Sequence, residues 1–305
     1  MKMHEDKFAE FIKKWDKSAD VIGIPRGYYD RNIWIKKIEN KQGGYPFAAI
    51  YNSGREMRHS ASNKLNGCAL CRIVREYFET PARRFFENRF EGYIVTPNEF
   101  PPSEGALMLI STKEVPMYDS SNTENLGEDG EILRTMLEFG KENSLNIYHQ
   151  TVGAGATIGR HEHFHATTIY KFQEDIGDIG FDSSDLKQLR GIQGVYKIRE
   201  FPFAHLVFDI DKTEEIMYFI SNLSKIFEPN MANGTIPHTI SQGKNGVMIT
   251  PLKVDVGKSM GSELPPGFYY AKSKEEYEQI NFEKLMRFMS EIFYDKGEVT
   301  LERMI

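Results

Sequence analysis

Three histidines alternate with other residues in the middle of the chain, and this alternation constrains the local fold more than any other feature. His161, His163 and His165 occupy every second position, and a β-branched and aromatic run continues to residue 170. Side chains two apart share one face of a strand, whereas on a helix they point in different directions. The segment 161–170 is therefore predicted to be a strand that carries all three imidazoles on one face.

Imidazoles gathered on one strand fit more than one kind of site. A neutral imidazole, with an ordinary pKa of about 6.5, can attack phosphorus directly and divide one substitution into two steps. The glycine-rich segment 153–160 could bring backbone N–H groups close to a phosphate, and Arg160 could add positive charge. Three imidazoles also suit zinc, iron or nickel, so a metal-binding protein stays open. A ladder of exposed histidines is the plainest alternative.

Composition narrows the class of protein. The chain has 305 residues, enough for two packed units or one large one, and its formal net charge of -6 argues against a general nucleic-acid binder. No apolar run is long enough to span a bilayer, and the first residues lack the apolar stretch of a secretory signal. Two cysteines make no disulfide framework. We therefore expect a cytoplasmic protein that binds neither nucleic acid nor membrane.

The apolar pattern predicts an α+β fold of two similar units, each an antiparallel sheet with packed helices, spanning residues 1–190 and 191–305. In the first unit we expect helices at 5–17, 70–78 and 131–142 and strands at 32–38, 92–96, 106–111 and 145–152. In the second we expect strands at 194–199, 205–210, 236–241 and 246–251 and helices at 213–227 and 282–294. The two strands flanking Gly243 to Gly246 are expected to form a hairpin. The connection at 173–190 is expected to be acidic and then helical.

A Cys-x-x-Cys pair, Cys68 and Cys71, is a separate signal. Such a pair can supply half of a tetrahedral zinc site. The alternative is two thiols at the start of a buried helix, because free cysteine is often buried.

The residues around the histidines resemble the signature of the histidine-triad superfamily. Segment 155–166 reads Gly-Ala-Thr-Ile-Gly-Arg-His-Glu-His-Phe-His-Ala and is most similar to GDP-hexose phosphorylases and galactose-1-phosphate uridylyltransferases. The phosphorylase motif reads Ala-Thr-Ile, a short spacer, then His-x-His-Phe-Gln-Ala. This chain has one additional spacer residue, and His165 stands where those enzymes carry glutamine. Weaker similarity covers the family's nucleotide-cradling strands at 88–98 and 105–110, and its second half at 201–208 and 236–240.

The resemblance implies histidine-triad-like units and a covalent mechanism. The central histidine, His163, would attack the α-phosphorus of a nucleotide and form a nucleotidyl-histidine. His165 would contact the phosphate oxygens or the leaving group, and His161 would orient the site or bind zinc. No organic cofactor is implied.

Further binding residues follow from the same resemblance. Asn98 lies where family members contact the nucleoside, and Gly155, Thr157 and Arg160 are the candidate phosphate-binding residues. Uridylyltransferases complete their zinc site with a distant histidine and the first triad histidine. The distant position falls near Glu114, so the expected ligands of a structural zinc ion are Cys68, Cys71, Glu114 and His161.

The expected function is therefore that of a nucleotidyltransferase acting on a nucleotide sugar. Phosphate is the favoured acceptor, which means phosphorolysis of a GDP-hexose-like substrate to a nucleoside diphosphate and a hexose-1-phosphate; a sugar phosphate is the other acceptor. The alternative is a nucleotidyl hydrolase, because hydrolases of the family carry histidine at the position of His165. A chain long enough for two units favours the transferase and phosphorylase branch of the family over the hydrolases. The base, the sugar and the oligomeric state stay open, and an edge strand or the N-terminal helix could mediate a homo-oligomer.

Overall fold

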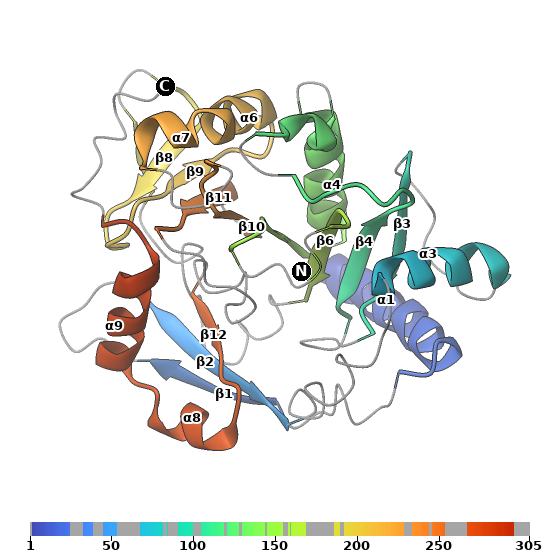
Figure 1. Cartoon of the computed structure of the whole chain (residues 1–305). Coiled ribbons are helices and arrows are strands. Elements are labelled where there is room, and N and C mark those ends of the chain that lie inside the picture. Colours follow the sequence, from blue (N-terminus) through green and yellow to red (C-terminus); the bar gives the residue numbers. More distant parts are fainter. Residues whose placement is uncertain are drawn as a thin grey trace.

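A computed structural model describes most of both predicted units (Figure 1). The described residues are 2–24, 33–38, 45–53, 68–81, 84, 91–99, 105–118, 121–127, 130–143, 145–154, 158, 160–168, 186–189, 192–228, 234–243, 246–253 and 267–295. The predicted phosphate-binding residues Gly155 and Thr157 lie outside them, as does most of the segment 173–190. Among the helices described, none is long and apolar enough to cross a membrane.

One large antiparallel sheet runs through the molecule. In spatial order its nine strands are β3-β4-β6-β5-β10-β11-β9-β8-β7, and every neighbouring pair is antiparallel. From the first half come β3 (Tyr93–Pro97), β4 (Leu107–Ser111), β5 (Asn146–Gln150) and β6 (His163–Thr167). The others are β7 (Leu186–Gln188), β8 (Val195–Ile198), β9 (Leu206–Phe208), β10 (His238–Gly243) and β11 (Gly246–Pro251). The predicted α+β class is confirmed.

The strand order shows how two similar units share this sheet. The first half reads β3-β4-β6-β5 from its outer edge inward, and the second reads β8-β9-β11-β10. A helix follows the second strand in each half, α4 (Glu131–Glu142) after β4 and α6 (Thr213–Ser221) after β9. The two units meet where β5 pairs with β10, with His149 opposite Ile240. The place of the histidine strand β6 is taken in the second half by β11, which contains no histidine.

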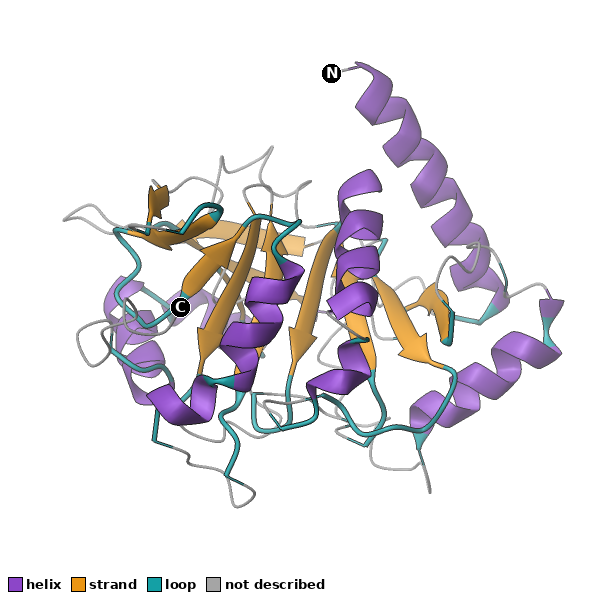
Figure 2. Cartoon of the chain, turned by 90° about the horizontal axis from the view of Figure 1, so that it is seen from above, coloured by secondary structure: helices purple, strands orange, loops and turns teal. Residues whose placement is uncertain are grey.

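The helices α1 (Lys2–Val21), α4, α6 and α7 (Leu223–Ile226) contribute to the core on one face of the sheet (Figure 2). Their apolar side chains pack with Phe164 and Ala166 of β6 in one cluster. Burying each large side chain contributes about 1.5–3 kcal/mol, so this face anchors the strands. Trp15 of α1 is fully buried and its indole N–H donates to the carbonyl of Ala106 over 2.8 Å. His163 and His165 alternate with Phe164 and Ala166, so they lie on the opposite face of β6.

A second, three-stranded sheet and two helices lie over that opposite face. Its order is β1 (Ile33–Ile38), β2 (Phe47–Asn52) and β12 (Phe268–Tyr270), with β12 parallel to β2. Ala48 and Ile50 of β2 pack against Tyr148 of β5. The chain closes with α8 (Lys274–Gln279) and α9 (Phe282–Ile292), and α9 packs in the same cluster as Met248 of β11. The sequence pattern did not predict β2, β12 or α8.

Several predicted elements need correction. The predicted histidine strand 161–170 is shorter, since β6 begins at His163. The expected helix at 213–227 is two helices, because Asn222 ends α6 by donating its side-chain amide to the carbonyl of Tyr218. Residues 186–188, expected to be helical, form the edge strand β7 because they pair with β8. The hairpin of β10 and β11 is confirmed, with Gly243 opposite Gly246.

Gly246 provides a test of this hairpin. Its φ is +139°, and a Cβ atom there would lie 2.4 Å from the carbonyl oxygen of Phe208. Replacement of Gly246 by alanine is expected to lower the free energy of unfolding by at least about 2 kcal/mol, because both the backbone and the contact must shift. Gly234→Ala is the control, since Gly234 also has a positive φ of +76° but no atom lies within 4 Å of its Cβ position. Equal midpoints for the two variants in urea unfolding would contradict the placement of Gly246.

Candidate active site

Two of the three histidines face each other on the site face of the sheet. Because Phe164 and Ala166 point into the helix-covered core, His163 and His165 point to the other face. Their ring centroids are 5.1 Å apart and the rings are nearly perpendicular, at 75°. His163 is buried, with 3% of its surface exposed, whereas His165 is partly exposed. The pair therefore places a shielded imidazole beside a more accessible one.

The hydrogen bonding of His163 determines where its proton lies. Its Nδ1 is 2.8 Å from the carbonyl oxygen of His161, and a carbonyl can only accept, so Nδ1 carries the proton and Nε2 carries the lone pair. Burial lowers the pKa of His163 to about 4, although the bond to His161 and the carboxylate of Glu162 oppose this effect. The ring is thus neutral near pH 7, with Nε2 in the nucleophilic form.

His205 shows what distinguishes His163. Its Nδ1–H donates to the carbonyl of Phe203 over 2.8 Å, so its tautomer matches that of His163. However, its Nε2 accepts the backbone N–H of Ile198 over 2.8 Å, and the ring is fully buried. The lone pair of His205 is already used in the fold.

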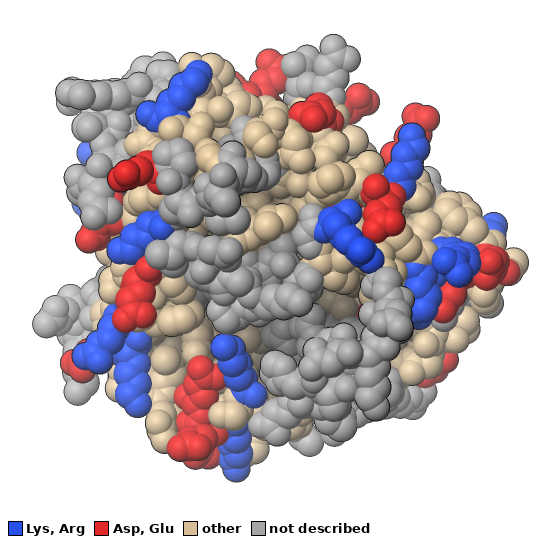
Figure 3. Space-filling model, viewed as in Figure 1, with Lys and Arg blue, Asp and Glu red and all other residues tan. Residues whose placement is uncertain are grey.

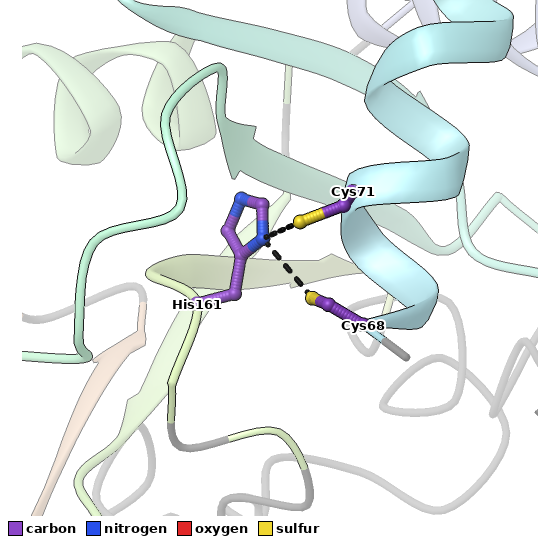
Figure 4. A group of neighbouring side chains, drawn as sticks. All are labelled: Cys68, Cys71 and His161. Atoms are coloured by element: carbon purple, nitrogen blue, oxygen red, sulfur yellow. Dashed lines mark hydrogen bonds between the residues drawn. The ribbon is translucent and has the colours of Figure 1, made fainter. Parts of the chain in front are cut away.

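His161 belongs to a different group of side chains. It precedes β6, and its Nε2–H donates to the carbonyl of Ser111 over 2.8 Å, which leaves Nδ1 unprotonated. Nδ1 lies 3.3 Å from Sγ of Cys68 and 3.4 Å from Sγ of Cys71 (Figure 4). The prediction that all three imidazoles lie together on one strand is therefore wrong, because the strand starts after His161 and its ring turns to the cysteines.

The helix α3 (Ala69–Glu79) positions these cysteines. Cys68 is its N-cap residue and Cys71 lies in its first turn, so both sulfurs point from one helix end toward His161. The apolar side of α3 packs on Ile94 and Ile110 of the large sheet. The pKa of the Cys71 thiol is raised to about 12, chiefly by burial and further by its hydrogen bonds with Cys68 and Glu114. The ligand atoms of Cys68, Cys71 and His161 all lie within 4.8 Å of one another, so this cluster could bind a metal ion.

Glu114 and Arg160, two other predicted site residues, lie beside the cysteine cluster. Glu114 is close enough to Cys71 for a hydrogen bond. It also pairs with Arg160, whose Nε is 3.3 Å from a Glu114 carboxylate oxygen. Both side chains are about half exposed, at 47% and 59%. The carboxylate is thus near the position that a fourth ligand would need, and Arg160 is directed toward it.

The remaining predicted residue of the site, Asn98, follows the end of β3. It is 7% exposed, and its backbone N–H donates to the carbonyl of Ala106 over 2.9 Å, which closes the β3–β4 connection. The same face of the sheet carries further buried polar side chains around the histidine pair: Asn146, Gln150, Thr167, Thr239, Ser241 and Thr250. The site therefore lies on a polar strip that continues from the first half into the second.

Sequence reasoning missed one buried ionic group. Glu162 lies between His161 and His163 and is fully buried, and its Oε1 is 2.7 Å from Nε2 of His149 on β5. Its other oxygen accepts the backbone N–H of Tyr118 over 2.5 Å. A carboxylate inserted between two histidines in the motif was the available signal, because charged residues are rarely fully buried unless they are paired.

Comparison with known proteins places this fold. No protein-family model and no curated protein sequence matches the chain. The continuous sheet of two similar units, with a histidine pair in the first, defines a two-unit α+β protein. At the level of the fold, the resemblance predicted from the sequence is confirmed.

In particular, the chain is similar to yeast Ap4A phosphorylase Apa2. The structure in complex with AMP matches with a TM-score of 0.60 and 12% identity, covering 95% of this chain and 97% of that chain. The structure in complex with Ap4A matches with a TM-score of 0.56 and 10% identity, covering 95% and 98%. A weaker likeness, with a TM-score of 0.35 and 11% identity over 82% of this chain and 99% of that chain, is to ADP-glucose phosphorylase from Arabidopsis thaliana with bound ADP-glucose. These likenesses concern the fold.

Proposed function

We propose that this protein is a nucleotidyltransferase that forms a covalent nucleotidyl intermediate on His163. The observation that carries the proposal is the state of that ring: its proton is held on Nδ1 by the carbonyl of His161, it is neutral, and its Nε2 lone pair lies on the face that carries His165. A nucleophile that needs no separate base suits substitution at phosphorus. His205, with the same tautomer, has its lone pair occupied.

In the first step, Nε2 of His163 attacks the α-phosphorus of the nucleotide. The new N–P bond forms as the bond from phosphorus to the bridging oxygen breaks, and that oxygen leaves with the electron pair. The proton stays on Nδ1, where it is hydrogen-bonded to the carbonyl of His161, so the ring becomes a cation in the intermediate. His165, beside it, would contact the phosphate oxygens or protonate the leaving oxygen.

In the second step an oxygen of inorganic phosphate attacks the same phosphorus and the N–P bond returns its electrons to Nε2. With a GDP-hexose-like substrate the products are a hexose-1-phosphate and then a nucleoside diphosphate. The fold likeness to Ap4A phosphorylase Apa2 supports phosphorolysis as the reaction type and adds dinucleoside polyphosphates as a substrate class to be compared with nucleotide sugars. Asn98 is proposed to contact the nucleoside, and Arg160 and the glycine-rich segment before it the phosphates.

Small phosphorylated substrates also fit the charge distribution better than an extended polyanion does. On the face shown in Figure 3, the coloured Lys and Arg side chains alternate with Asp and Glu side chains and form no continuous basic stripe. Ion pairs such as Lys274 with Glu278, 3.8 Å apart, and Lys212 with Glu215, 3.1 Å apart, also bring opposite charges together along single helices. A basic stripe is the usual electrostatic mark of nucleic-acid binding.

Hydrolysis is the second candidate, and one residue favours it. His165 stands where the similar phosphorylases and uridylyltransferases carry glutamine, and it is partly exposed beside His163. A titratable group at this place could activate water against the intermediate, which would release a nucleoside monophosphate.

The cysteine cluster is proposed to hold a structural zinc ion. The donor set fits: two cysteine sulfurs and an unprotonated Nδ1 converge, and the other nitrogen of His161 donates to the Ser111 carbonyl, as ligating histidines usually do. Glu114 is proposed as the fourth ligand, in place of its pairing with Arg160. A bound zinc ion would supply a rigid link between α3 and the residues just before β6. Because His161 also anchors the proton of His163, that link would steady the nucleophile.

A panel of substrates tests the reaction. GDP-hexose, UDP-hexose, ADP-glucose and Ap4A are incubated with the protein, with and without phosphate, and products are separated by chromatography. We expect at least one substrate to be consumed at least about tenfold faster with phosphate, and the product to be a nucleoside diphosphate. A rate that ignores phosphate and yields nucleoside monophosphate would establish hydrolysis instead. No consumption of any substrate would reject both reactions.

A further inference from the structure

The buried Glu162–His149 pair lies behind the proposed nucleophile. Glu162 points away from the face of its neighbours in the motif, and both members of the pair are fully buried. The ring of His149 is packed between Tyr118, with ring centroids 4.2 Å apart, and Phe164, at 4.6 Å. A carboxylate accepts hydrogen bonds, so Nε2 of His149 carries the proton and donates to Glu162 over 2.7 Å.

Glu162 also fastens residues 111–118 to the start of β6. Its backbone N–H donates to the carbonyl of Val115 over 2.9 Å, and its carbonyl accepts the N–H of Ser111 over 3.0 Å. Its side chain accepts the N–H of Tyr118 over 2.5 Å. Three bonds from one residue thus fix the segment that carries Glu114 relative to the residue that precedes His163.

A buried carboxylate needs a reason, because taking such a charge out of water costs several kcal/mol and an apolar pair of the same volume is often more stable. An ionised carboxylate accepts at both oxygens, and here one oxygen accepts the N–H of Tyr118 while the other faces Nε2 of His149. The negative charge lies one residue from His163. That ring is neutral before the reaction and positively charged once its Nε2 is bonded to phosphorus while Nδ1 keeps its proton.

We propose that Glu162, held in place by His149, is a positioning residue whose fixed negative charge stabilises the cationic ring of the nucleotidyl-His163 intermediate and whose bonds fix that ring's orientation. The inference deepens the proposed function and rests on it. The step balances without a further reactant: the N–P bond forms, the bond to the leaving oxygen breaks, and no proton moves from the imidazole. The partners of Glu162 are protein groups next to β6, namely His149 and the backbone of residues 111–118. Glu162 does not contact the substrate.

Three variants separate charge from geometry. Glu162→Gln removes the charge but can accept from Tyr118 and donate to His149 after a change of tautomer. His149→Gln keeps a donor for Glu162, whereas His149→Phe keeps the ring packing and removes the donor. Glu138→Gln, an exposed carboxylate on α4, is the matched control.

Two rates are measured for each variant. The first is formation of the alkali-stable nucleotidyl-histidine from a labelled nucleotide substrate in a single turnover, together with KM. The second is the phosphorylation of His163 by phosphoramidate, a small reagent that transfers phosphate to imidazole and releases ammonia, read by mass spectrometry. Removing a donor that touches a transition-state charge costs about 10²–10³-fold, so a charge acting through the strand is expected to cost about tenfold.

We expect Glu162→Gln to slow both rates about tenfold with KM unchanged, His149→Phe to slow them several-fold, and His149→Gln to recover most of that loss. Wild-type rates in Glu162→Gln would overturn the inference while leaving the nucleotidyl intermediate established. If the wild type forms no nucleotidyl intermediate, the proposed function fails, and the phosphoramidate rates alone decide the role of Glu162. If Glu162→Gln does not fold, equal rates for His149→Gln and His149→Phe overturn the inference.

Discussion

Replacing His163 by alanine is expected to abolish the nucleotidyl intermediate and to lower turnover by at least about 10³-fold. The reason is geometric. The ring of His163 is buried, its proton is held on Nδ1, and its Nε2 lone pair is directed to the face that carries His165. A water molecule in the vacated space has neither the nucleophilicity nor the fixed orientation. The measurement is a quenched single turnover with nucleotide labelled at the α-phosphate, followed by peptide mapping of the label.

His205→Gln is the matched control for this experiment. His205 has the same tautomer and is also buried, but its lone pair accepts the N–H of Ile198, so its loss should lower stability and leave labelling of His163 intact. His165→Gln restores the residue of the similar phosphorylases and should keep the label while raising the share of phosphorolysis over hydrolysis. Label that persists in His163→Ala, or that maps to His165, would contradict the proposed nucleophile.

Much of the fold could be predicted because its signals are local. The helix α4 has the predicted bounds, and the hairpin of β10 and β11 follows from alternating apolar residues around a glycine-containing turn. The strand β2 gives a weaker local signal, because two of its six residues are alanine, which is depleted in strands, and one of its partners, β12, lies far along the chain. The helix α8 was missed although Ser273 accepts the N–H of Glu276, a capping pair that the sequence displays.

The site was predictable only in part, for a physical reason. The alternation of histidines predicted that His163 and His165 share one face of a strand, because period two is a property of the strand itself. The division of the triad was not predictable, because it depends on where β6 begins: His161 precedes the strand and turns to the cysteines of α3, about ninety residues earlier in the chain. The Glu162–His149 pair depends on the packing of β5 beside β6, a non-local contact that no spacing rule reports.

The metal proposal leads to the second large effect. Purified protein is expected to contain stoichiometric zinc, and Cys68→Ser or His161→Gln should remove most of it and lower the free energy of unfolding by at least about 3 kcal/mol, because a structural zinc ion binds the folded state alone. His161→Gln should also slow the labelling of His163, since the carbonyl of residue 161 holds the ring's proton and would no longer be braced. Mass spectrometry measures the metal content, and urea unfolding with and without a chelator measures the change in stability.

Two further variants distinguish the roles around the fourth ligand. Glu114 is half exposed and shared with Arg160, so Glu114→Gln should weaken zinc binding less than Cys68→Ser, because water can take the vacant position. Arg160→Gln releases the carboxylate from its ion pair and should keep the zinc, with an affinity equal to or above that of the wild type. Full zinc retention in both Cys68→Ser and His161→Gln would reject the ligand set.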